Sequence, residues 1–161
     1  RDTDRSRGLG DVYKRQEFAG TVPVRHLLPY WKTGNRYLFS GGSVNMRDAA
    51  VYAKEENWSK AVELWKQTYE TKKGKQKMYA AYNTALGYEM QDSIDTALEW
   101  ALKAQTLARE KSKTDKKETG EIHNGTISYY IFISMYVDEL EKRKEGMARL
   151  NMQMNRFDDD F

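Results

Sequence analysis

Two stretches of this chain, ENWSKAVELWKQ at residues 56–67 and DSIDTALEWALK at residues 92–103, follow one pattern. When they are overlaid at an offset of 36 residues, small and aromatic residues coincide before, within and after them. The coinciding pairs are Ala49 with Ala85, Tyr52 with Tyr88, Ala61 with Ala97, and Thr68 with Ala104. Each unit reads as an apolar helix, a polar break and an amphipathic helix, and such a period is typical of stacked helical hairpins.

Alanine recurs where the two helices of each hairpin would cross. Antiparallel helices approach most closely where neither side chain intrudes, and alanine allows this while keeping high helix propensity. We therefore expect buried alanines at positions 49, 61, 85 and 97, and a central packing role for Trp65. Asn57 and Ser93 stand where an N-cap belongs, at the start of each second helix.

The matched positions resemble those of tetratricopeptide repeats, which carry small residues and an aromatic at corresponding places. The units lack the closing proline, their period is longer than usual, and Asp92 stands where a turn glycine is common. The resemblance implies a tetratricopeptide-like stack whose first helices line a concave surface. An antiparallel helix bundle rich in alanine remains the alternative.

The fold class expected from the whole chain is all-α, with a short irregular or β segment at the N-terminal side. Residues 17–44 hold both prolines and many aromatics, and they are interpreted as the remnant of an upstream domain packed on the helices. The remaining expected parts are two hairpins at 45–110, a polar linker at 111–126, a capping helix at 127–156 that Thr126 would cap, and a disordered tail at 157–161.

Residues 1–16 are set apart because SRGLGDVYKRQ, at residues 6–16, resembles a translated sequencing adaptor. The chain has 27 Lys and Arg against 24 Asp and Glu, and residues 1–16 hold five of the former and three of the latter. The rest therefore carries 22 basic and 21 acidic residues, a net charge of +1. Net charge consequently gives no argument for binding to a polyanion.

The residues that usually carry catalysis or metal binding are scarce. The chain has no cysteine, and neither His26 nor His123 has a partner at ligand spacing. Glu121 with His123 would form a two-ligand loop, which rarely holds zinc. The glycines of SGGS, at residues 40–43, lack the spacing and the lysine of a phosphate-binding loop. We expect no catalytic residue, cofactor or metal, and therefore a protein that is not an enzyme.

A lysine cluster keeps nucleic-acid binding open as one alternative. Lys72, Lys73, Lys75 and Lys77 precede Tyr79 and Tyr82, and lysines beside aromatics can hold phosphates and stack bases. The lysines fall in the turn between the two units, where solvated charge is the common outcome. Binding to nucleic acid is thus the less favoured hypothesis.

Protein or peptide binding is the favoured function, through the concave face that the tetratricopeptide resemblance implies. The candidate groove residues are Met46, Ala50, Lys54, Tyr79, Tyr82, Asn83, Leu86 and Glu89. Asn83 matches an asparagine with which chaperone-binding members clamp a C-terminal carboxylate, whereas Met46 and Ala50 replace its usual partners. The alternative is that these residues pack against the N-terminal segment and bind no partner.

A wider resemblance covers residues 18–156 and rests on RYLFSGG, MRDAA, NWSKAVELWK, YNTALGYEMQDSIDTALEWALKA and LNMQM. The chain is similar to the C-terminal half of uncharacterised bacterial cell-envelope lipoproteins, a family of unknown function with tetratricopeptide-like helices. This implies an exported protein, in the periplasm or outer membrane, with a lipid anchor upstream; without it a cytoplasmic location is expected. The resulting hypothesis is a scaffolding module of unknown protein partner, or else a structural domain that supports an upstream functional one.

Overall fold

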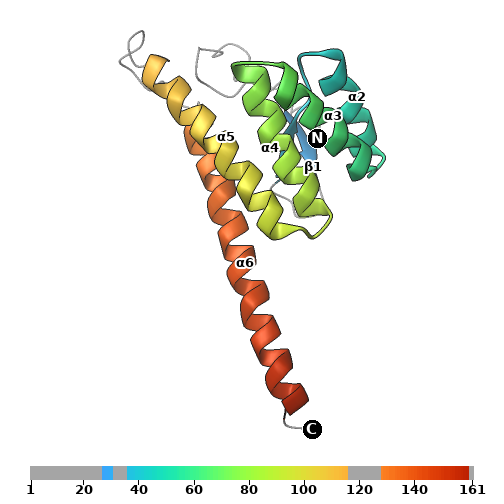
Figure 1. The fold of residues 1–161 in the computed structure, drawn as a ribbon, viewed down its shortest axis with the longest axis vertical. Coiled ribbons are helices and arrows are strands. Elements are labelled where there is room, and N and C mark those ends of the chain that lie inside the picture. The colour runs from blue at the N-terminus through green and yellow to red at the C-terminus, as the bar shows by residue number, and fades with distance from the viewer. Residues whose placement is uncertain (1–26, 31–35, 116–127, 160–161) are drawn as a thin grey trace, which may run out of the picture.

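The computed structural model describes residues 27–30, 36–115 and 128–159. Within these ranges the chain forms five helices and one small hairpin, so the expected all-α class is confirmed (Figure 1). The helices are α2 Val44–Lys54, α3 Trp58–Thr71, α4 Lys75–Met90, α5 Ile94–Asp115 and α6 Tyr129–Asp159, and the strands are β1 Leu27–Tyr30 and β2 Arg36–Phe39. The expectations for residues 1–16, His26, Glu121, His123 and Thr126 lie outside the described residues.

The helices stack in chain order. α2 packs on α3, α3 on α4, α4 on α5 and α5 on α6, while β2 lies against α4 and α2 (Figure 1). β1 pairs antiparallel with β2, from Leu27 opposite Phe39 to Tyr30 opposite Arg36. α4 is apolar nearly all round because it is enclosed by α3, α5 and β2, and most of its residues are buried.

The two hairpin turns have the same geometry, 36 residues apart. Glu56 and Asp92 both adopt a positive φ, at 58° and 61°. The next amide reaches back in each turn, from Asn57 N to Tyr52 O at 2.8 Å and from Ser93 N to Tyr88 O at 2.9 Å. This is how a left-handed residue ends a helix while its last carbonyls remain hydrogen bonded.

The close helix contacts expected from the small residues are present. Ala49, Ala61, Ala85 and Ala97 are all fully buried, and so is Trp65. Gly87 lets α4 approach α3 closely, since an added Cβ would lie 2.3 Å from Cγ2 of Val62 on α3. The expected N-cap at Asn57 is confirmed, because its side chain accepts a hydrogen bond from the Lys60 amide.

Two expected boundaries differ from those of the described helices. α5 continues through residues 111–115 instead of ending at 110, because that segment contains neither glycine nor proline. α6 continues to Asp159, so residues 157–159 are helical rather than a disordered tail, again because no helix breaker precedes them. α6 begins at Tyr129, and the Ser128 hydroxyl accepts from the Ile131 amide at 3.2 Å, so Ser128 caps this helix.

The described helices do not meet the requirements of a membrane span. None of them combines the length and the apolar character that crossing a bilayer demands.

Candidate functional site

The candidate site is the inner face of α4, where this helix binds β2. Asn83 is completely buried, and its amide pairs with the backbone of Phe39 in both directions. The Phe39 amide donates to Oδ1 of Asn83 at 2.9 Å, and Nδ2 of Asn83 donates to the Phe39 carbonyl at 2.7 Å. One asparagine side chain thus makes the two hydrogen bonds to the Phe39 backbone that a neighbouring strand would otherwise make.

A second residue of α4 extends this contact along β2. The Tyr82 hydroxyl donates to the Tyr37 carbonyl at 2.8 Å. Tyr37 and Phe39 are two residues apart, so their backbone polar groups point to the same edge of the strand. β1 pairs with β2 along the other edge. Both edges of β2 are therefore satisfied, one by a strand and the other by side chains of a helix.

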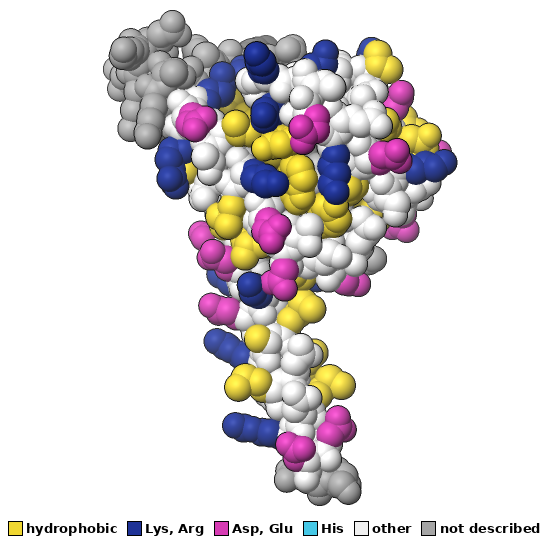
Figure 2. Space-filling view, viewed as in Figure 1, with side chains coloured by type: hydrophobic (Ala, Val, Ile, Leu, Met, Phe, Trp, Pro, Cys, Tyr) yellow, Lys and Arg dark blue, Asp and Glu magenta, His cyan; other side chains and the backbone are white. Residues whose placement is uncertain are grey.

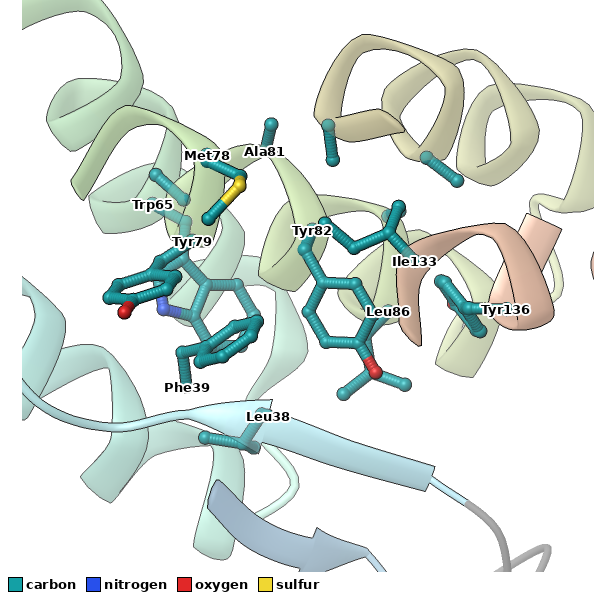
Figure 3. Packing of buried hydrophobic residues seen from close by; sticks show 14 of the residues in the cluster. Leu38, Phe39, Trp65, Met78, Tyr79, Ala81, Tyr82, Leu86, Ile133 and Tyr136 are labelled. Carbon is teal, nitrogen blue, oxygen red and sulfur yellow. The ribbon is translucent and has the colours of Figure 1, made fainter. Parts of the chain in front are cut away.

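The Phe39 ring is held in an aromatic pocket (Figure 3). It stacks on Tyr79 with ring centroids 4.2 Å apart, and it meets Tyr82 edge-on at 5.2 Å. From α6, Phe132 approaches the same ring edge-on at 5.9 Å. Offset and edge-to-face contacts of this kind add to the free energy gained from burial alone.

A buried ionic network lies at the other end of the strand and joins three elements. Arg36 of β2 binds the Glu89 carboxylate of α4 in a bidentate manner, with Nε at 2.8 Å and Nη2 at 3.0 Å. α6 contributes the Tyr136 hydroxyl at 3.0 Å and Arg143 Nη1 at 2.7 Å to the same carboxylate. Glu89 therefore has two cations and a hydroxyl around a side chain with no exposed surface.

The network determines the charge states of its members. Burial raises the pKa of Glu89, but hydrogen bonds from Arg36, Arg143 and Tyr136, together with the Arg36 charge, lower it by more, so the carboxylate is ionised at neutral pH. Burial lowers the pKa of Arg36, but the hydrogen bond to Glu89 and the electrostatic influence of Glu89, Tyr136 and Tyr82 together raise it by more. Burial and the nearby Glu89 charge raise the pKa of Tyr136 well above its ordinary value, so this phenol stays protonated.

The residues predicted to line a groove lie mostly inside the molecule. Only Lys54 is exposed; the buried ones are Met46, Ala50, Tyr79, Tyr82, Asn83, Leu86 and Glu89. Four of them meet the chain's own β2 or α6. Asn83 and Tyr82 bind the backbone of β2, Glu89 binds Arg36 and Arg143, and Tyr79 bonds through its hydroxyl to Tyr129.

Sequence reasoning missed the residues that meet this face from other elements. These residues are Arg36, Phe39, Tyr136 and Arg143. Arg36 and Arg143 lie 53 and 54 residues away from Glu89 along the chain, so no local spacing links them. The alternation of RYLF gave no usable signal, because it assigns Arg36 and Phe39 to opposite sides of a strand, yet both are buried and both contact α4.

The structure does not gather the aromatics and lysines of the nucleic-acid hypothesis on one surface. Tyr79 and Tyr82 are buried against Phe39, where no base could stack on them. Two of the lysines lie over rings of the chain itself, with Lys77 Nζ 4.6 Å from the centre of Tyr69 and Lys75 Nζ 5.8 Å from that of Tyr129.

The metal-ligating side chains of the described residues are dispersed. No three of their Asp, Glu or His side chains come close enough together to hold a metal ion. The buried carboxylate of Glu89 is taken up by Arg36, Arg143 and Tyr136, so its acceptor capacity is already used.

Two hollows lie on a different face, along α2 and α3, and none of the predicted groove residues lines them. The first is lined by Asn45, Glu63, Lys66, Gln67, Glu70, Thr71 and Trp100, and the second by Asp48, Val51, Tyr52, Glu55, Lys60, Glu63 and Leu64.

Comparison with known proteins places these observations in a family. Neither the curated proteins nor the solved structures contain a match to the chain. A family model described as "Domain of unknown function (DUF6340)" matches residues 47–142, from α2 into α6. This range includes Asn83, Glu89 and Tyr136 and covers more than half of the chain. The chain belongs to the DUF6340 family.

Proposed function

We propose that this chain is a non-enzymatic scaffolding module of the tetratricopeptide-like kind, whose inner face holds an extended segment of its own chain. The observation that carries the proposal is the paired hydrogen bond between Asn83 and the Phe39 backbone. A side-chain amide that pairs with both polar groups of one residue recognises an extended backbone regardless of side chains, as strand addition does.

The aromatic pocket and the ionic network add side-chain selectivity to this recognition. The pocket of Tyr79, Tyr82 and Phe132 accepts a flat ring, and Glu89 accepts a guanidinium three residues earlier in the strand. Together they read an Arg-x-x-Phe segment in extended form. In this proposal the module holds the hairpin of β1 and β2 on the helices. The hairpin in turn would hold any functional domain upstream in a fixed position relative to the helices.

The proposal includes the cell-envelope setting implied by the resemblance to bacterial lipoproteins. The family that residues 47–142 match is described as one of unknown function, so this setting rests on the sequence resemblance alone. Its direct test is fatty-acid labelling of the full-length protein in its bacterial host, and a protein that takes up no label would contradict the anchor.

The scaffolding role is tested on Asn83. Replacing it by alanine leaves the buried amide and carbonyl of Phe39 without partners, at a cost of about 1–3 kcal/mol for each group. We expect Asn83→Ala to accelerate hydrogen exchange at the Phe39 amide, and protease cleavage before α2, while helices α3 to α5 keep their protection. Amide exchange followed by mass spectrometry measures both regions in one sample.

The control is Asn45→Ala, because within the described residues Asn45 pairs with Gln67, at 3.5 Å on the surface of α2 and α3. This variant should leave β2 as protected as in the parent. The proposal fails if Phe39 exchanges at the parent rate in Asn83→Ala, because the strand would then be held by other contacts.

A further inference from the structure

The C-terminal part of α6 leaves the body of the molecule as a single helix (Figures 1 and 2). Arg143 is its last partly buried residue, bound to Glu89, and Lys144 reaches back to Asp95 at 3.0 Å. Every residue from Lys144 to Asp159 is exposed. Single helices of this length are marginal in water, so this segment gains little stability by itself.

An apolar stripe runs along the projecting segment. Its members are Met147, Leu150, Met154 and Phe157, which are 43%, 55%, 58% and 70% exposed. Their alternating spacing of three and four residues is that of paired helices, and it continues the spacing of Ile133, Tyr136 and Leu140 in the body. The same helical face is therefore buried against the protein in its first half and open to solvent in its second.

We propose that this stripe is the interface with a second copy of the chain, and that the two α6 helices pair antiparallel about a two-fold axis level with position 152, midway between Leu150 and Met154. In that register Met147 meets Phe157 of the partner subunit, and Leu150 meets Met154 of the partner subunit. Each layer occurs twice, as a two-fold interface requires.

The charges beside the stripe favour this register. Lys144 and Asp158 lie on the same flank of the stripe, eight residues before and six residues after position 152, so their levels in the antiparallel pair differ by only two residues. The antiparallel pair places Lys144 opposite Asp158 of the partner subunit, twice. A parallel pair would instead bring Gly146 and Gln153 next to the partner's Asn151 and Asp158, without any opposite charges.

The length of the projection fits the same partner. The pair extends from Lys144 to Asp158 in both copies, which is the part of α6 that leaves the body. The end of one helix therefore arrives where the other helix meets its own body. With few apolar layers, the interface is smaller than the roughly 1,600 Å² of a standard complex, and we expect dissociation in the micromolar range.

Sedimentation of the full chain between about 1 and 300 μM tests the proposal, because this range brackets micromolar dissociation. The parent should change from monomer to dimer, and Met154→Glu should remain monomeric at every concentration. Met152→Glu is the matched control, since Met152 is 64% exposed but lies outside the stripe. Both sites are on the exposed surface, so neither change should unfold the body, as circular dichroism can verify.

A charge exchange tests the register. Asp158→Lys and Lys144→Glu should each weaken the dimer several-fold, because each places like charges opposite one another twice, and the double variant should regain affinity. A parent that stays monomeric throughout, equal loss in the two methionine variants, or no recovery in the double variant would each overturn the proposal.

Discussion

Asn83 illustrates how a single residue directs the path of the chain. An asparagine in the middle of a helix has low helix propensity, and a completely buried one must satisfy both a donor and an acceptor. Here both needs are met by the backbone of Phe39, which has the complementary pair of groups. The buried Asn83 side chain therefore lowers the stability of the fold only slightly, and it fixes the position of β2.

Asp92 is a second residue whose local cost is visible. It occupies the left-handed region with φ at 61°, which non-glycine residues adopt at a cost of about 1–2 kcal/mol. We expect Asp92→Gly to be more stable than Asp92→Ala by about 1 kcal/mol, because only glycine removes the steric strain. Urea unfolding of the two variants gives the difference directly.

Both variants lack the Asp92 carboxylate, so the effect of losing it on the free energy of unfolding cancels when the two are compared. Asp92 is 4.0 Å from Arg143 on the surface, so losing this contact affects both equally and little. Equal stability of the glycine and alanine variants would mean that the turn relaxes when the side chain changes.

At the scale of the element, the contact between α3 and α4 depends on the absence of a side chain. Gly87 lies against Val62 and the ring of Trp65, and Trp65 is fully buried. Glycine in a helix interior is less favourable than alanine, and that loss is offset by the shorter distance between the two helix axes.

Gly87→Ala is therefore expected to destabilise the protein although it improves helix propensity. The added methyl group overlaps Cγ2 of Val62, and overpacking of about 1–3 kcal/mol exceeds the gain of about 1 kcal/mol from propensity. Thermal unfolding should show a lower midpoint than in the parent.

Gly146→Ala is the matched control, because nothing lies near the added group on the projecting part of α6. This variant should keep the unfolding midpoint of the parent or raise it slightly. If Gly87→Ala behaved like Gly146→Ala, the helices would not be in contact at that point.

At the scale of the whole molecule, Glu89 connects parts that are far apart in the sequence. Its carboxylate binds β2 through Arg36 and α6 through Tyr136 and Arg143, while its backbone belongs to α4. A buried charge that loses its partners is costly, so these elements are expected to unfold together rather than one by one.

This network predicts a specific pH dependence. Because the folded-state pKa of Glu89 lies below its ordinary value of 4.5, its contribution to stability is present above that value and is lost as the pH falls toward the folded-state pKa. Glu89→Gln should lower the free energy of unfolding at neutral pH by about 3–5 kcal/mol. Urea unfolding at several pH values between about 7 and 3 should show a shallower acid loss in the variant than in the parent.

The other carboxylates titrate in both proteins, so the difference between the two curves reports on Glu89 alone. Curves that run parallel through the acid range would show that this carboxylate keeps its ordinary pKa in the folded state.

The sequence by itself determined the helical part of this protein. The 36-residue offset predicted both hairpins, and small residues at Ala49, Ala61, Ala85 and Ala97 predicted the close contacts. Local spacing suffices here because neighbouring helices in a hairpin meet through residues that are close in sequence. Helix ends were predicted less well, since capping at Ser128 and the extension to Asp115 depend on weak local preferences.

Only the tertiary structure decided what occupies the inner face of α4. The sequence predicted Asn83 and Glu89 as binding residues, but their spacing did not show whether they bind a partner or another part of the same chain. Phe39 lies 44 residues from Asn83, and Arg36 and Arg143 lie 53 and 54 residues from Glu89. Contacts over such separations produce no periodic pattern in the sequence, because they depend on how β2 and α6 pack against the helices in three dimensions.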